Sequence, residues 1–134
     1  MQYLSIQGGG KRQKEFTFNI ASFAIEKLFP KIKNYEITIN LGSDKNDCFE
    51  WINREYEINI NKIQTHDDFV TAIFHELVHV KQYIYGQMDD YSYKNYEEYI
   101  NHPIEKEAYK LQEELLDQWK IMKKPMSKHI DVWH

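Results

Sequence analysis

The sequence HELVH at residues 75–79 brings together residue types that can bind and activate a metal ion. His75 and His79 are four residues apart, so on a helix both imidazoles lie on one side and can reach a single zinc ion at about 2.0–2.1 Å. Glu76 does not ligate in this arrangement, but it lies beside the ion and can accept a proton from the water bound there. Because only three positions are fixed, the same five letters can also arise by chance on an ordinary helix.

The helix that carries HELVH has a complete apolar stripe without the two histidines. At about 100° per residue, its apolar side chains gather on one side and both imidazoles fall on the other. The stripe consists of Phe69, Val70, Ile73, Phe74, Leu77, Val80 and Ile84. We expect Thr65 to be the N-cap and Gly86 to end the helix after about Tyr85. The core does not require the histidines, which favours a role for them as ligands.

A catalytic zinc site needs a third protein ligand and an open coordination position. The downstream segment PIEKEAYKLQEELLDQW contains two carboxylates close together. We expect Pro103 to begin a helix that continues to about Met122, with Glu105 at the inner edge of its apolar face and Glu107 facing solvent. A carboxylate that points inward needs a partner, which a zinc ion or a basic side chain could provide. The sequence favours Glu105 as the third ligand.

HELVH followed by PIEKEAY resembles the gluzincin branch of zinc metallopeptidases, in which two His come from the motif helix and a Glu from the next helix. The small size resembles the minigluzincins, and the pattern HExxHxxQ…PxExEAY resembles small uncharacterised proteins of phages and bacteria. The resemblance covers about residues 16–122, and its specific motifs lie only at 75–83 and 103–109.

This resemblance implies that His75, His79 and Glu105 bind Zn²⁺ and that Glu76 is general base and acid. Gluzincins commonly carry an acidic residue four positions after the Glu ligand, where this chain has Tyr109. A phenol, or another residue, would then have to support the histidines.

Hydrolysis of a peptide bond also needs a donor for the oxyanion. Tyr83 lies one turn after His79 and is our candidate for this catalytic role. Further phenols lie in the tyrosine-rich segment between the ligands, at Tyr91, Tyr93, Tyr96 and Tyr99. We expect this segment to be a long polar connection.

The hydrophobic patterns predict an α+β fold, a compact zincin-like domain. Its order is a helix, a three-stranded mainly antiparallel sheet, the HExxH helix and the glutamate helix. The first elements are a helix over 16–29 and strands over 35–41, 47–53 and 55–61. We expect the catalytic domain to span 1–122 with a flexible start over 1–14, and residues 123–134 to form a C-terminal tail.

Composition excludes some functions. The 134 residues are enough for one domain, and the net charge of −4 at pH 7 comes from both signs scattered along the chain. This argues against charge-driven binding of nucleic acid or a membrane surface. The single Cys48 and the lack of an apolar signal segment indicate a cytoplasmic protein.

The expected function is that of a zinc-dependent endopeptidase acting on a peptide or protein substrate. The substrate would lie along a sheet edge, for which DCFEWI at 47–52 is the candidate. The alternatives are a latent or non-catalytic metal-binding or interaction protein of phage or mobile-element type, a plain binding module with a chance motif, and a hydrolase of other amides. The tail could also inhibit its own site through His129, Asp131 or His134.

Overall fold

A computed structural model describes residues 2–43, 47–52, 54–87 and 96–123. A strand and a helix come first, three consecutive strands follow, and the remaining elements are helices. The elements are β1 (Gln2–Gln7), α1 (Lys11–Leu28), β2 (Tyr35–Gly42), β3 (Cys48–Ile52), β4 (Glu55–Asn61), α2 (His66–Ile84), α3 (Tyr96–Asn101) and α4 (Pro103–Lys123). None of these helices is both long and apolar enough to cross a membrane.

The described strands form one mixed sheet in the order β1-β2-β4-β3. β1 pairs with β2 in parallel, β2 pairs with β4 in parallel, and only β3 and β4 are antiparallel. The α+β class is therefore confirmed, whereas the predicted three-stranded, mainly antiparallel sheet is wrong. The parallel pairs arise because α1 returns the chain between β1 and β2, and because β4 inserts between β2 and β3.

Within the segment 1–14, where the sequence predicts a flexible start, the described residues include β1 and the first turn of α1. The glycines that indicated flexibility instead form a turn of fixed shape. Gly8 has a φ of 82°, and a Cβ atom there would collide with the backbone oxygen of Leu41 in the neighbouring strand. Only glycine fits this position without strain, so the turn joins β1 closely to β2.

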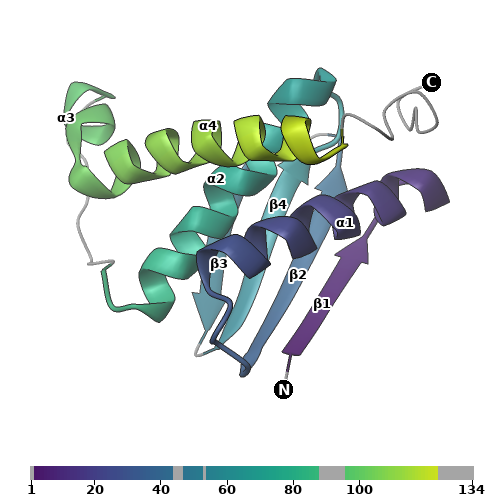
Figure 1. Ribbon diagram of the computed structural model, residues 1–134, viewed down its shortest axis with the longest axis horizontal. Helices are drawn as coiled ribbons and strands as arrows, with labels where there is room; N and C mark the ends of the chain where they lie inside the picture. Colours follow the sequence, from purple (N-terminus) through teal and green to yellow (C-terminus); the bar gives the residue numbers. More distant parts are fainter. Residues whose placement is uncertain (1, 44–46, 53, 88–95, 124–134) are drawn as a thin grey trace.

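Figure 1 shows α1 and α2 lying across the same face of the sheet, with α4 crossing α2. The alternation predicted for the strands is confirmed on this face, where every second residue is buried. Those residues are Tyr35, Ile37, Ile39 and Leu41 of β2 and Tyr56, Ile58 and Ile60 of β4. Aromatic rings fill the space between the helices, and Phe23 packs against both Phe74 and Trp119.

The opposite face of the sheet is polar and is covered by none of the described helices. Its register brings like charges together, since Glu36 lies opposite Glu55 and Glu50 lies opposite Glu57. The amide of Asn40 donates a hydrogen bond of 2.7 Å to Glu57. This face carries four glutamates on three neighbouring strands.

The connection between α2 and α4 contains one further element. α3 covers Tyr96–Asn101, where the sequence predicts a polar connection. The side-chain amide of Asn101 donates to the backbone oxygen of Glu97 at 2.8 Å and supports this turn of helix. α3 leads directly into α4 (Figure 1).

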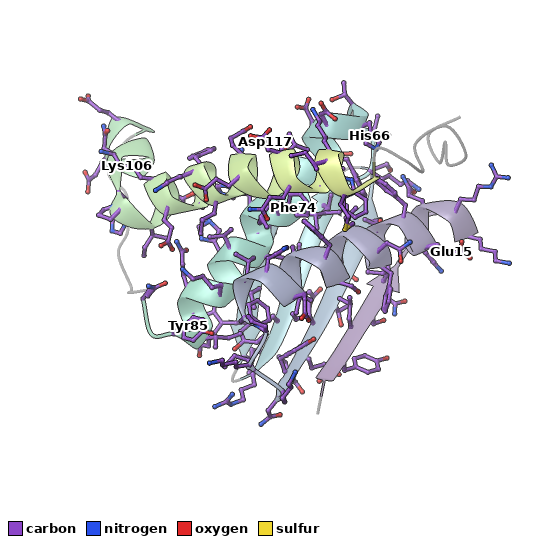
Figure 2. The ribbon with its side chains drawn as sticks, in the orientation of Figure 1. Glu15, His66, Phe74, Tyr85, Lys106 and Asp117 are labelled. Carbon is purple, nitrogen blue, oxygen red and sulfur yellow. The ribbon has the colours of Figure 1, made fainter. Side chains whose placement is uncertain are left out.

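Phe74 should contribute strongly to stability, because it is fully buried at the centre of the molecule (Figure 2). We expect Phe74→Ala to lower the free energy of unfolding by about 3–5 kcal/mol, since it removes a large apolar side chain and leaves a cavity. Phe18→Ala is the matched control, because the Phe18 side chain is 46% exposed. Urea unfolding of both variants measures the difference, and equal losses would contradict this account of the core.

Candidate metal centre

Helix α2 begins where the sequence predicts. The Thr65 side chain accepts a hydrogen bond from the backbone N–H of Asp68, and acidic residues occupy the first turn. Both features stabilise a helix N-terminus. Gly86, with a φ of 70°, follows the last turn. The apolar stripe faces the core, and this fixes the direction in which His75 and His79 project.

Helix α4 supplies the third side chain of the site. Its apolar face packs against α2 through residues that include Ile104, Ala108 and Leu115. Glu105 lies at the edge of this face and is only 5% exposed. The packing of the two helices therefore turns the Glu105 carboxylate toward the two imidazoles.

The three predicted ligands meet. His75 Nε2 lies 3.1 Å from Glu105 Oε1, and His79 Nε2 lies 3.4 Å from Glu105 Oε2. The two Nε2 atoms are 3.2 Å apart, and the imidazole planes are nearly perpendicular at 87°. These side chains form a group that could hold a metal ion.

A buried amide orients His79. Gln82 is 1% exposed, and its Nε2 donates to the backbone oxygen of Ile104 and to Glu107 Oε1, both at 2.9 Å. With the amide nitrogen fixed in this way, Gln82 Oε1 faces His79 Nδ1 at 2.7 Å and can only accept. The proton of a neutral His79 therefore belongs on Nδ1, and the Nε2 lone pair points to the centre of the site.

The side-chain amide of Gln112 orients His75 in the same way. Gln112 Oε1 lies 2.7 Å from His75 Nδ1, while Gln112 Nε2 donates to Glu113 at 3.3 Å. The Tyr109 ring also packs against the His75 ring, with 4.8 Å between their centroids. Two glutamines thus orient the histidines, and Tyr109 contacts one imidazole by its ring.

The site stabilises positive charge at its centre. Burial acts to raise the pKa of Glu105, but the adjacent imidazoles outweigh burial and lower this pKa to about 2. Burial acts to lower the pKa of His79, but Glu105 and Glu76 outweigh it and raise this pKa. Two imidazole lone pairs 3.2 Å apart repel each other unless a cation lies between them. The donor set therefore suits a cation shared by all three side chains.

Glu76 lies beside this group and is 6% exposed. Burial raises its pKa, and the neighbouring histidines act in the opposite direction. Glu76 and His75 both line an open cavity of about 310 Å³. The remaining lining residues are Asp47, Gln64, Asp68, Thr71, Ala72, Tyr109 and Gln112. A buried carboxylate thus borders a space that is open to solvent.

The side chains of Glu107 and Tyr83 make contacts that the sequence did not predict. The predicted solvent-facing position of Glu107 is wrong, because its carboxylate accepts from Gln82 and from Lys81 Nζ at 3.3 Å. The described ring contacts of Tyr83 are with Trp51 at 4.9 Å and Tyr56 at 5.6 Å. These contacts direct the Tyr83 ring toward the sheet.

Other candidate site residues lie partly or wholly outside the residues that the structure describes. Tyr91 and Tyr93 lie outside the described residues, as does the C-terminal segment with His129, Asp131 and His134. Tyr96 and Tyr99 belong to α3 by their backbone alone.

Gln82 and Gln112 are the functional residues that sequence reasoning missed. Gln82 follows His79 by three positions, so it lies on the same side of α2. Gln112 follows Glu105 by seven positions, within the inward stripe of α4. An amide at each inward position is the signal that could have found them.

In comparisons with known proteins, no family model, curated protein or solved structure matches the chain.

Gln82 should strengthen metal binding, because it holds His79 in the required tautomer and direction. We expect Gln82→Ala to weaken the affinity for a divalent ion by about 10–100-fold. Gln118→Ala, at an exposed position of α4, is the matched control. Competition with a chelating dye measures both affinities, and an unchanged affinity in Gln82→Ala would refute the positioning role.

Metal binding should weaken as the pH falls, because a proton and a metal ion compete for the same imidazole nitrogens. The pKa of His79 is raised, so the loss of affinity should begin at a higher pH than for an ordinary histidine. The affinity is complete well above this raised pKa and falls as the pH drops through it. Titrations between about pH 5.5 and 8 measure the slope, and a flat profile would rule out imidazole ligands.

Proposed function

We propose that this protein is a small zinc-dependent peptidase of gluzincin type. His75, His79 and Glu105 bind the metal, and Glu76 is the general base and acid. The observation that carries the proposal is the convergence of two oriented Nε2 atoms and one carboxylate next to a buried glutamate at an open cavity. A structural zinc site has no need for such a glutamate and is usually closed by four protein ligands.

The separations of the ligand atoms support zinc. Two atoms bound at about 2.0–2.1 Å to one tetrahedral ion lie about 3.3 Å apart. The two imidazole Nε2 atoms lie 3.2 Å apart, His75 Nε2 lies 3.1 Å from Glu105 Oε1, and His79 Nε2 lies 3.4 Å from the other carboxylate oxygen, Glu105 Oε2. Only three side chains converge among the described residues, and this leaves a tetrahedral ion one position for water or substrate.

Zinc in this site would polarise the scissile carbonyl and lower the pKa of a coordinated water from about 15.7 toward about 7. Glu76 then takes the proton from the attacking water. It passes this proton to the amine that leaves. The burial that raises the pKa of Glu76 supports both steps, because a base that must later act as an acid works best near the operating pH.

The substrate would be an extended peptide held at the edge of the sheet. β3 is an edge strand, so one side of its backbone pairs with none of the described strands. Asp47, directly before β3, lines the same cavity as His75 and Glu76. A peptide that pairs with β3 would therefore pass the proposed general base.

Tyr109 is better supported than Tyr83 as the donor to the oxyanion. The Tyr109 ring packs on His75 and lines the cavity that contains Glu76. The Tyr83 ring packs on Trp51 and Tyr56 instead. In the proposed mechanism, the Tyr109 hydroxyl stabilises the negative charge that develops on the carbonyl oxygen.

The metal assignment predicts about one zinc per chain, and this zinc should depend on Glu105. We expect wild-type protein to carry zinc and Glu105→Gln to lose most of it, while Glu114→Gln at an exposed position of α4 keeps it. Zinc at 100 times its Kd should stabilise the fold by about 2.7 kcal/mol, or roughly 10 °C in Tm. Elemental mass spectrometry and thermal unfolding measure these effects, and zinc that survives in Glu105→Gln would contradict the ligand set.

Catalysis should depend on Glu76 separately from metal binding. We expect Glu76→Gln to lower kcat for peptide hydrolysis by about 10²–10⁴-fold, because proton transfer to and from water is lost. The variant should retain its zinc, which elemental analysis checks. A fluorogenic peptide library measures hydrolysis. A zinc-loaded wild type without hydrolysis, or a fully active Glu76→Gln, would refute the mechanism.

A further inference from the structure

The cavity beside the metal ligands carries an excess of negative charge. Asp47, Asp68 and Glu76 are among its lining residues, and none of the described lining residues is a lysine or an arginine. A cavity lined by one sign of charge attracts groups of the opposite sign. The question is whether partners within the protein already compensate these charges.

Among the described contacts, neither aspartate carboxylate has a charged partner, and only that of Asp47 accepts hydrogen bonds. Asp47 accepts from the backbone N–H of Asn61 at 2.9 Å and from the side-chain amide of Gln64 at 3.3 Å. Asp68 lies in the first turn of α2, where the helix N-terminus favours an anion. Its neighbour Asp67 differs, because Lys120 Nζ lies 2.9 Å from the Asp67 carboxylate. Lys120 thus compensates Asp67, while Asp68 borders the cavity.

Glu76 supplies an independent observation at the same place. Its side chain is 94% buried and lines the cavity, yet it makes no hydrogen bond to a described residue. A buried carboxylate without a donor is costly unless a ligand or water completes it. Glu76 therefore presents a hydrogen-bond acceptor to water or to a ligand in the cavity.

The charges around the metal can be counted separately from those on the rest of the cavity wall. A divalent ion and the Glu105 carboxylate leave one positive charge, which Glu76 balances. Asp47 and Asp68 then remain as two negative charges on the cavity wall. Gln64 and Thr71 add polar groups to this wall, and Ala72 leaves room for a long side chain.

We infer that this cavity selects a substrate with a lysine or arginine side chain next to the bond that is hydrolysed. The inference rests on the proposed peptidase function and names its substrate class. The cationic end of the side chain lies by Asp47 and Asp68, and the backbone pairs with β3. Hydrogen bonds to charged groups at such a site contribute enough for about a tenfold difference in affinity.

Binding to an inactive form tests the cavity without requiring hydrolysis. The probes are octapeptides with blocked ends and no charged residue except at the central position, which is lysine, norleucine or glutamate, titrated into zinc-loaded Glu76→Gln protein. We expect the lysine peptide to bind about tenfold more tightly than the norleucine peptide, and the glutamate peptide to bind most weakly. Asp68→Asn in the same background should remove most of the preference, whereas Asp117→Asn, at an exposed position of α4 outside the cavity, should keep it.

Equal binding of the lysine and norleucine peptides would overturn the inference, as would a preference that survives Asp68→Asn. Failure of the lysine peptide to bind would overturn it as well. Mapping the cleavage sites of the wild type in a peptide library separates this inference from the proposed function. Cleavage without lysine or arginine enriched within two residues of the cut refutes the selectivity and leaves the peptidase standing. Lysine-dependent binding without any cleavage supports the selectivity and refutes hydrolysis.

Discussion

The buried carboxylate of Glu105 is the interaction on which the site depends. It lies between two helices that meet through apolar side chains and through further polar contacts, and burying it would cost several kcal/mol without partners. His75 and His79 are those partners. The polar contacts continue from His79 to Gln82, and from Gln82 back to the first turn of α4. These polar contacts return to α4 and fix the position of α4 along α2. Apolar packing alone would not fix this position.

Local spacing was sufficient to predict which three side chains come together, because each lies on a regular helix with a clear apolar stripe. His75, His79 and Glu105 follow from that geometry, and the structure brings them together. Gln82 and Gln112 could not be assigned in the same way, since each makes a contact between α2 and α4: Gln82 to Ile104, 22 residues away, and Gln112 to His75, 37 residues away. Whether an inward amide orients a histidine depends on the packing of α2 against α4.

The errors in the fold have similar causes. β1 was missed because three glycines follow it, and glycines predict flexibility unless a neighbouring strand demands their conformation. Parallel pairing of β1, β2 and β4 depends on how the chain crosses over between strands, and alternation within a strand does not report it. Glu107 lies away from the apolar stripe of α4, but the buried Gln82 amide reaches it from α2.

The uncovered sheet face has a consequence for how copies of the protein meet. Glu36, Glu50, Glu55 and Glu57 are spread over three neighbouring strands, so two such faces repel each other before their backbones approach. This repulsion protects a broad flat surface and the adjacent edge strand β3 from stacking. Salt shortens the range of the repulsion to about 8–10 Å near physiological ionic strength and further above it. The glutamates of this face therefore keep two copies apart less effectively as the ionic strength rises.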